Sequence, residues 1–200
     1  LAGAIWAVAA IGIWMSLLAG WITLPTAFGP VGWHVHELLF GYLAAIVAGF
    51  LLTAVPNWTG QLPVVGWPLL GLVLLWLSGR CAVMLSEWLG AVPAALVDLS
   101  FLSVLGLVLA REIIAGRNWR NLTVLALVSS LLLANALHHW ETATGAMHSF
   151  APRLGISTAV MLVALIGGRV VPSFTRNWLA RRPSGRMPIP VGRFDVIALF

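Results

Sequence analysis

Charged residues are scarce in this sequence. Aspartate, glutamate, lysine and arginine make up 8% of its 200 residues, and lysine does not occur at all. A soluble domain carries about a quarter charged residues, whereas this chain is 60% hydrophobic. The composition therefore excludes a soluble globular domain and predicts a membrane protein with several spans.

Several chemical signatures are also missing. The single cysteine, Cys81, lies in an apolar run, so there is no disulfide framework and no CxxCH motif for covalent haem attachment. No glycine-rich phosphate loop, HExxH or GxSxG motif is present, which argues against a nucleotide enzyme that faces the aqueous phase. Charged residues inside the apolar runs are too few for a multi-step proton pump.

Apolar runs divide the chain into transmembrane segments. A helix needs roughly twenty apolar residues to cross the hydrocarbon core, and a helix satisfies its own backbone in lipid. We expect an all-α, polytopic transmembrane helix bundle that forms a single integral membrane domain over residues 1–200. Its six spans are predicted at residues 4–24, 38–55, 67–85, 94–110, 122–137 and 154–171, each followed by proline or glycine.

The two ends of the sequence suggest a longer protein. Leu1 is not a start methionine, and no basic segment of the kind that marks a signal peptide precedes the first span. Residues 195–200 look like the beginning of a seventh span. We therefore expect the chain to be a fragment, with the remaining half of the longer chain as its partner.

Arginine predicts the orientation of the bundle. The net charge of +5 would suggest nucleic acid in a soluble domain, but in a membrane protein it reports positive charge in cytoplasmic loops, so no nucleic-acid partner is expected. Only Arg80 and Arg153 fall on one side of the predicted spans. The other nine of the 11 arginines fall on the side where the first span starts, which is therefore predicted to be cytoplasmic. Tryptophans near the span ends, Trp6 and Trp33 among them, fit aromatic belts at both faces.

All five histidines fall on the opposite, predicted periplasmic side. His34 and His36 precede the second span, His138 and His139 end the fifth, and His148 lies in the loop that follows. Imidazole is a common ligand of haem iron and also suits copper and zinc. Histidines from separate helix ends can surround one ion or hold a haem from both sides. We therefore predict that these residues bind cofactors.

The spacing of these residues along a helix limits which of them can bind the same metal ion. His34 and Glu37 lie on one face if their helix begins early, and His36 then points elsewhere, to a different metal or to lipid headgroups. His138 and His139 are separated by about 100° on a helix, so a rigid helix cannot offer both to one ion. The candidate metal ligands are His34, His36, Glu37, His138 and His139, and their division among metals stays open.

Two polar residues in neighbouring spans are candidates for orienting these ligands. A metal-bound imidazole usually donates its other N–H to a carboxylate or carbonyl, and both Asp98 and Asn135 lie at a similar depth to His139. A carboxylate as deep as Asp98 is costly and functional by default, with pairing to Arg80 as an equal alternative. For the histidines, the simplest alternative is an ordinary interfacial role without a metal.

Four blocks of the sequence together resemble the NnrS family: WHVHELLFGY at 33–42, AGFLLTAVPNWTG at 48–60, LLWLSGR at 74–80 and IGGRVVPSFT at 166–175. NnrS proteins are bacterial inner-membrane proteins linked to nitric oxide metabolism and described as containing haem and copper. Members are longer, so the chain resembles their N-terminal half. The resemblance implies non-covalent haem and copper bound by histidines, with matching positions at His34, His36, His138, His139 and His148.

The expected function is the handling of nitric oxide or a related small molecule, or a response to nitrosative stress, through redox chemistry at the metal or through sensing. Whether the protein turns over a substrate stays open. A second hypothesis is a transporter or channel for a small solute or metal ion, with Asp98 and the histidines along its path. A third is a purely structural subunit of a larger complex.

Overall fold

The computed structural model describes residues 1–146, 150–182 and 187–188. Every regular element in this part of the chain is a helix, so the predicted all-α fold is confirmed. The chain falls into two compact units, Leu1–Ile156 and Ser157–Phe200. The single membrane domain over the whole sequence stays a prediction.

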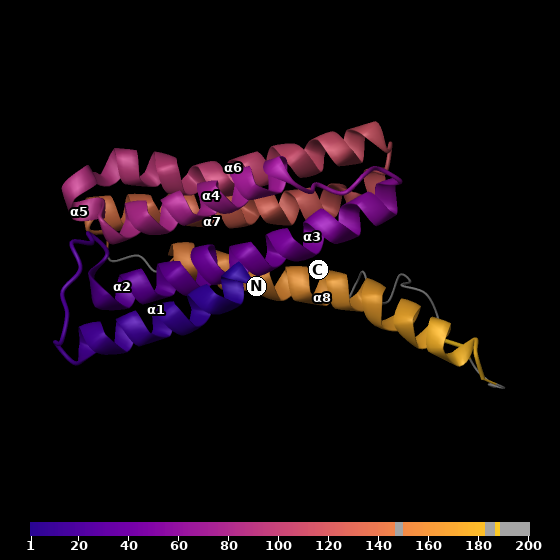
Figure 1. Cartoon of the computed structure of the whole chain (residues 1–200), viewed down its shortest axis with the longest axis horizontal. Coiled ribbons are helices and arrows are strands. Elements are labelled where there is room, and N and C mark those ends of the chain that lie inside the picture. Colours follow the sequence, from indigo (N-terminus) through magenta and orange to yellow (C-terminus); the bar gives the residue numbers. More distant parts are fainter. Residues whose placement is uncertain (147–149, 183–186, 189–200) are drawn as a thin grey trace. The chain divides into compact units, whose positions relative to one another are not determined.

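In the first unit, α1 (Ala2–Leu18) runs back along the first half of a much longer helix (Figure 1). That helix is continuous through α2 (Gly29–His36), the π-helix η1 (Glu37–Leu43) and α3 (Ala44–Thr59). Together these three elements contain 31 residues. The start of α1 therefore lies beside the middle of the long helix and not at one of its ends.

The long helix differs at both ends from the predicted second span, residues 38–55. It begins at Gly29, so the histidine block lies within the helix and not before it. Pro56 was predicted to end the helix but lies inside it; a transmembrane helix tolerates proline where neighbouring groups satisfy the freed backbone. The helix ends at Gly60, whose φ of 74° is left-handed and suits glycine.

The other helices of this unit pack around α6 (Ala91–Ala115). It contacts α4 (Trp67–Met84) and α7 (Leu122–Thr144) as well as α3 (Figure 1). Two short elements, α5 (Ser86–Leu89) and the 3₁₀-helix η2 (Trp119–Asn121), connect α4 to α6 and α6 to α7. Because α6 touches three partners, a side chain on its buried face can reach groups from several helices.

The buried face of α6 has one polar member. Its buried residues recur at the three- and four-residue spacing of a helix face: Ala94, Asp98, Phe101, Leu102, Leu105, Leu109 and Ile113. A carboxylate on such a face needs partners, because an uncompensated charge in an apolar interior is very costly. We therefore expect the polar side chains of this bundle to gather around Asp98.

The last described helix, α8 (Phe150–Leu179), begins in the first unit. The backbone N–H of Ala151 donates to Oε1 of Glu141 at 3.1 Å, which satisfies one of the amides that a helix start leaves open. The helix continues through Pro172 to Leu179, so the predicted end of the sixth span at residue 171 is wrong.

Among the described residues, five helices are long and apolar enough to cross a membrane: Gly29–Thr59, Trp67–Met84, Ala91–Ala115, Trp119–Thr144 and Phe150–Leu179. With 17 residues, α1 is a shorter apolar helix. The multi-pass membrane character is thus confirmed, while the count of six spans is not. The predicted start of a seventh span, residues 195–200, lies outside the described residues.

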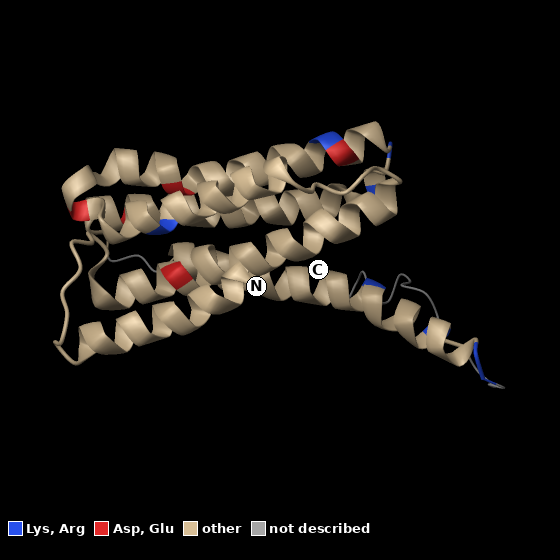
Figure 2. Cartoon of the chain, in the orientation of Figure 1, with Lys and Arg blue, Asp and Glu red and all other residues tan. Residues whose placement is uncertain are grey.

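Charged residues are rare along the helices (Figure 2). Exposed tryptophans lie at both ends of the first unit, as expected for aromatic belts: Trp21, Trp88 and Trp140 at one end, Trp67 and Trp119 at the other. Trp6 and Trp33 were wrongly assigned to the belts. Trp33 is fully buried, and Trp6 hydrogen-bonds to Glu37 in the interior.

Candidate functional site

His36 lies at the centre of a buried polar cluster. Its side chain is fully buried at the end of α2. Nε2 lies 3.1 Å from Oδ2 of Asp98 and 3.0 Å from Oδ1 of Asn135. The other ring nitrogen, Nδ1, lies 3.2 Å from Oε1 of Glu37. Groups from α2 and η1, from α6 and from α7 therefore meet at one imidazole.

Asp98 lies on α6 and contacts side chains from the neighbouring helices. Its Oδ2 accepts hydrogen bonds from Nε2 of His139 at 3.0 Å and from Nδ2 of Asn135 at 2.8 Å, and its Oδ1 is paired with Nη2 of Arg80. His36, Asp98 and His139 each offer one ligand atom, and these three atoms lie within 4.8 Å of one another. The three buried side chains are the candidate metal site.

Arg80 balances two buried carboxylates. While Nη2 pairs with Asp98, Nη1 lies 2.9 Å from Oε2 of Glu37. The same Glu37 oxygen accepts a hydrogen bond of 2.7 Å from Nε1 of Trp6. The predicted pairing of Arg80 with Asp98 is confirmed. Arg80 lies within α4, inside the predicted span 67–85, and is 2% exposed, so its charge belongs to the interior of the bundle.

Glycines and a π-helix make room for this cluster. A π-helix bonds residue i to i+5 and often occurs at functional sites; η1 carries Glu37 and Gly41 toward α4. A Cβ on Gly41 would collide with Nη1 of Arg80 and lie 2.7 Å from Oε2 of Glu37. A Cβ on Gly79 would lie 2.8 Å from Oδ1 of Asp98. A larger residue at either position would displace the ion pairs.

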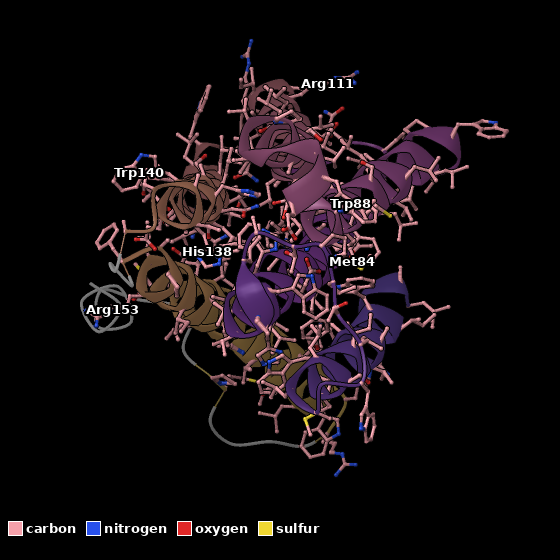
Figure 3. All side chains as sticks on the ribbon, turned by 90° about the vertical axis from the view of Figure 1, so that its left-hand side faces the viewer. Met84, Trp88, Arg111, His138, Trp140 and Arg153 are labelled. Atoms are coloured by element: carbon pink, nitrogen blue, oxygen red, sulfur yellow. The ribbon has the colours of Figure 1, made fainter. Side chains whose placement is uncertain are left out.

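His138 lies beside the cluster. Its ring centroid is 5.8 Å from that of His36, and its Nε2 is 3.4 Å from the carbonyl oxygen of Gly32. Its Nδ1 is buried and has no hydrogen-bond partner among the described residues. Viewed from the histidine-bearing end, His138 lies toward the middle of the bundle and Trp140 at the outside (Figure 3). One ring nitrogen of His138 is thus uncommitted.

Two phenylalanines enclose the imidazoles. The ring of Phe28 lies 5.1 Å from His36, 5.4 Å from His138 and 5.2 Å from His139, measured between centroids. Phe40 lies 5.5 Å from His36 and 5.8 Å from His138. These apolar rings lower the local dielectric, which strengthens the charge interactions of the cluster.

His34 belongs to a different environment. Its ring stacks on Trp14 of α1, with centroids 3.6 Å apart and an angle of 11° between the planes. Its Nδ1 is buried and unpartnered within the described part of the chain. His34 therefore faces α1 while His36, two residues later, faces α6 and α7.

The structure brings together five of the predicted site residues: His36, Glu37, Asp98, Asn135 and His139. His34 lies toward α1, His138 is adjacent to the cluster, and His148 lies outside the described residues. The option that His36 points to lipid headgroups is wrong, because its side chain is fully buried. Of the adjacent pair, His139 alone contributes to the candidate metal site, in agreement with the helical spacing.

Two residues of this region were missed from the sequence, Trp6 and Phe28. Their contacts with Glu37 and with three histidines are long-range, and nothing in the local pattern signals them. The two carboxylates also lie differently from what their predicted roles suggest, and those roles stay predictions. Asp98, expected to orient a ligand, offers a ligand atom itself, whereas Glu37, expected to bind metal, faces the second nitrogen of His36.

Comparison with known families gives one match. The family model described as NnrS protein matches residues 1–200. The chain belongs to the NnrS family. The resemblance inferred from the four sequence blocks is thus confirmed. Comparisons with curated proteins and with solved structures give no match.

Two of the NnrS blocks meet in the cluster. The block at 33–42 supplies His36, Glu37 and Gly41, and the block at 74–80 supplies Gly79 and Arg80. The NnrS block at 48–60 ends at the opposite end of the unit, where Nδ2 of Asn118 donates to the carbonyl oxygen of Trp58 at 2.6 Å. The first and third blocks thus supply part of the cluster, whereas Asp98 and His139 lie outside all four blocks. The second block joins α3 to the turn that follows α6.

Proposed function

We propose that this NnrS protein binds a copper ion through Nε2 of His36, Oδ2 of Asp98 and Nε2 of His139. We also propose that it acts at the bacterial inner membrane in nitric oxide metabolism or the response to nitrosative stress. The observation that carries the proposal is the convergence of these three buried ligand atoms within 4.8 Å in a membrane-helix bundle of this family.

The distances support a metal ion. Imidazole nitrogen and carboxylate oxygen bind first-row ions at about 2.0–2.2 Å, so tetrahedral ligands lie about 3.3–3.6 Å apart. The two Nε2 atoms lie 3.1 and 3.0 Å from Oδ2 of Asp98. Each Nε2–Oδ2 separation is thus a few tenths of an ångström from the separation of two ligands on one ion, and the three atoms all lie within 4.8 Å of one another. Imidazole with carboxylate suits copper.

The partners of the ligands support the same proposal. A metal-bound imidazole usually donates its other N–H to a carboxylate, and Nδ1 of His36 lies 3.2 Å from Oε1 of Glu37. Both ring nitrogens of His36 face acceptors, yet a neutral imidazole donates from one only. A second proton on the ring satisfies both acceptors, and a metal at Nε2 does so as well, since Nδ1 then donates to Glu37. Arg80 holds the far oxygen of Asp98 and so fixes the direction of Oδ2.

We propose further that haem is bound without covalent attachment, with His138 as the first candidate to hold it and His34 as the second. A histidine that would hold haem needs a ring nitrogen that no protein group uses. Nδ1 of each of these histidines is buried and unpartnered within the described residues. Haem iron and copper, when bound, supply one-electron chemistry and gas binding. Phe28 and Phe40 place apolar rings next to His36, and such surroundings favour an apolar small molecule over water.

The experiment is metal analysis and absorption spectroscopy on the full-length protein, purified after expression with haem and copper supplied. His139→Ala should lower the copper affinity at least tenfold, because even outer partners of a ligand contribute 10–100-fold, and should keep the Soret band. His138→Ala should weaken the Soret band and keep copper. Glu87→Gln, an exposed carboxylate change at the same end of the bundle, is the control.

Two outcomes would contradict the proposal. One is a colourless, metal-free preparation of the wild type. The other is equal loss of copper in His139→Ala and in the Glu87→Gln control. Metal uptake into proteoliposomes that Asp98→Asn abolishes, in protein without haem, would favour the transporter hypothesis instead. That hypothesis has less support, because Asp98 is 1% exposed and both of its oxygens are engaged.

A further inference from the structure

A groove between α4 and α6 lies away from the polar cluster. Its volume is about 320 Å³, and its apolar wall includes Pro68, Gly71, Leu75, Val104 and Val108. Pro68, Gly71 and Val104 are exposed, so the groove opens to the outside of the bundle, where a membrane-spanning helix meets lipid. Along α6 it extends toward the end of the helix. A long apolar chain fits this wall.

The end of the groove is polar. Arg111 and Glu112, the lining residues nearest the end of α6, supply a cation and a carboxylate. Oε2 of Glu112 is buried and has no hydrogen-bond partner in the part of the chain that the structure describes. A buried acceptor left unpaired is costly. A molecule bound in the groove can therefore satisfy Oε2 of Glu112 with a hydrogen-bond donor.

We propose that this groove binds a phospholipid of the phosphatidylethanolamine class, with an acyl chain along the apolar wall. The phosphate lies at Arg111, since a guanidinium is well suited to phosphate. The ammonium group donates to Oε2 of Glu112 in a charge-assisted hydrogen bond. The two charges of the headgroup thus meet two opposite charges of the protein. The proposal is independent of copper: Asp98 and Glu112 are separated on α6 by about 21 Å at 1.5 Å per residue.

Other membrane components match the groove less well. Phosphatidylcholine has the same charges but no N–H to donate to Glu112. Phosphatidylglycerol lacks the cation and brings a net negative charge near the carboxylate. A quinone has carbonyl acceptors and no cation, so it leaves Oε2 of Glu112 without a donor. The primary amine is therefore the feature that distinguishes the proposed occupant.

Native mass spectrometry of the complete protein in mild detergent tests the proposal, with dioleoyl phosphatidylethanolamine, phosphatidylcholine and phosphatidylglycerol as probes. The wild type should retain phosphatidylethanolamine about tenfold more than phosphatidylcholine, the effect of one charge-assisted hydrogen bond. Glu112→Gln should bring the two lipids within about twofold, because the amide keeps the shape of the side chain and loses the charge.

A pair of glycine substitutions tests the location. A Cβ on Gly71 meets no atom within 4 Å, so Gly71→Leu fills the groove without a backbone clash and should lower lipid retention about tenfold. Gly106→Leu is the control: its Cβ also meets nothing within 4 Å, and Gly106 does not line the groove. Equal retention of the three lipids by the wild type, or equal effects of the two leucines, would overturn the proposal. So would a bound quinone that Gly71→Leu releases.

Discussion

Arg80 illustrates what a single residue contributes to the cluster. It contacts Glu37 through one terminal nitrogen and Asp98 through the other, so two carboxylates from different helices share one guanidinium. All three side chains are buried. In a membrane interior a carboxylate without such a partner is expensive. The position of both acids next to His36 therefore depends on this cation.

The variant Arg80→Met removes that charge and keeps much of the volume. Breaking a buried ion pair by removing one partner costs about 3–5 kcal/mol, so the free energy of unfolding should fall by about that amount. Reversible unfolding in mixed detergent micelles measures it. The control is Arg153→Met, an exposed change that should stay within about 0.5 kcal/mol. Equal stability of the two variants would show that Arg80 does not hold the cluster together.

At the residue scale, part of the site could be predicted from the sequence. A carboxylate deep in an apolar run and histidines near span ends are rare enough to stand out, and Asp98, His36 and His139 do meet. The different positions of the two carboxylates relative to His36 were not predictable. Which of Glu37 and Asp98 faces the imidazole Nε2 depends on how three helices rotate against each other, and sequence spacing within one helix does not report that.

The π-helix η1 is the element on which the site depends. It interrupts the long helix at Glu37–Leu43 and is the part that carries Glu37 and Gly41. The carbonyl oxygen of Gly41 accepts a hydrogen bond of 3.0 Å from Nε1 of Trp76 on α4. Thus α4 contacts η1 through a tryptophan and an arginine, and the absence of a side chain at position 41 permits the close approach.

Gly41→Ala tests this packing. Its Cβ would collide with Arg80 and crowd Glu37, and overpacking of this kind costs about 1–3 kcal/mol. Gly49→Ala on α3 is the matched control, because a Cβ there meets no atom within 4 Å. Since alanine favours a helix more than glycine does, this control should raise the free energy of unfolding by up to about 1 kcal/mol. The same micelle unfolding assay compares them. If both variants are stabilised, the glycine at position 41 is not needed for the ion pairs.

At the element scale, the sequence predicted which segments are helices better than where they begin and end. Long apolar runs determine the existence of spans. The observed helix ends differ from the predicted span ends because Pro56 and Pro172 lie inside helices, and because the long helix begins at Gly29, before the histidines. The π-helix has no composition signal of its own, since it is stabilised by contacts from α4 and α1 that are distant in the sequence.

Across the whole molecule, charge predicts orientation. With Arg80 buried in the cluster, Arg153 is the only arginine left on the histidine-bearing side of the predicted spans. The positive-inside bias that puts the other side in the cytoplasm therefore becomes stronger. The orientation stays a prediction: we expect the proposed copper site toward the periplasmic face and the proposed lipid groove toward the cytoplasmic face.

Cysteine labelling tests that orientation, and the chain is suited to it because Cys81 is its single cysteine. In a Cys81→Ala background, Trp140→Cys places a thiol at the histidine-bearing end and Trp119→Cys places one at the other end. The native tryptophans are similarly exposed, at 56% and 57%. A charged maleimide does not cross the inner membrane, because moving a charge through hydrocarbon is too costly. It should therefore label the first variant in intact cells and the second only after the membrane is broken. The reverse pattern would put the histidines in the cytoplasm and overturn the periplasmic placement of the proposed copper site, while leaving its ligands unchanged.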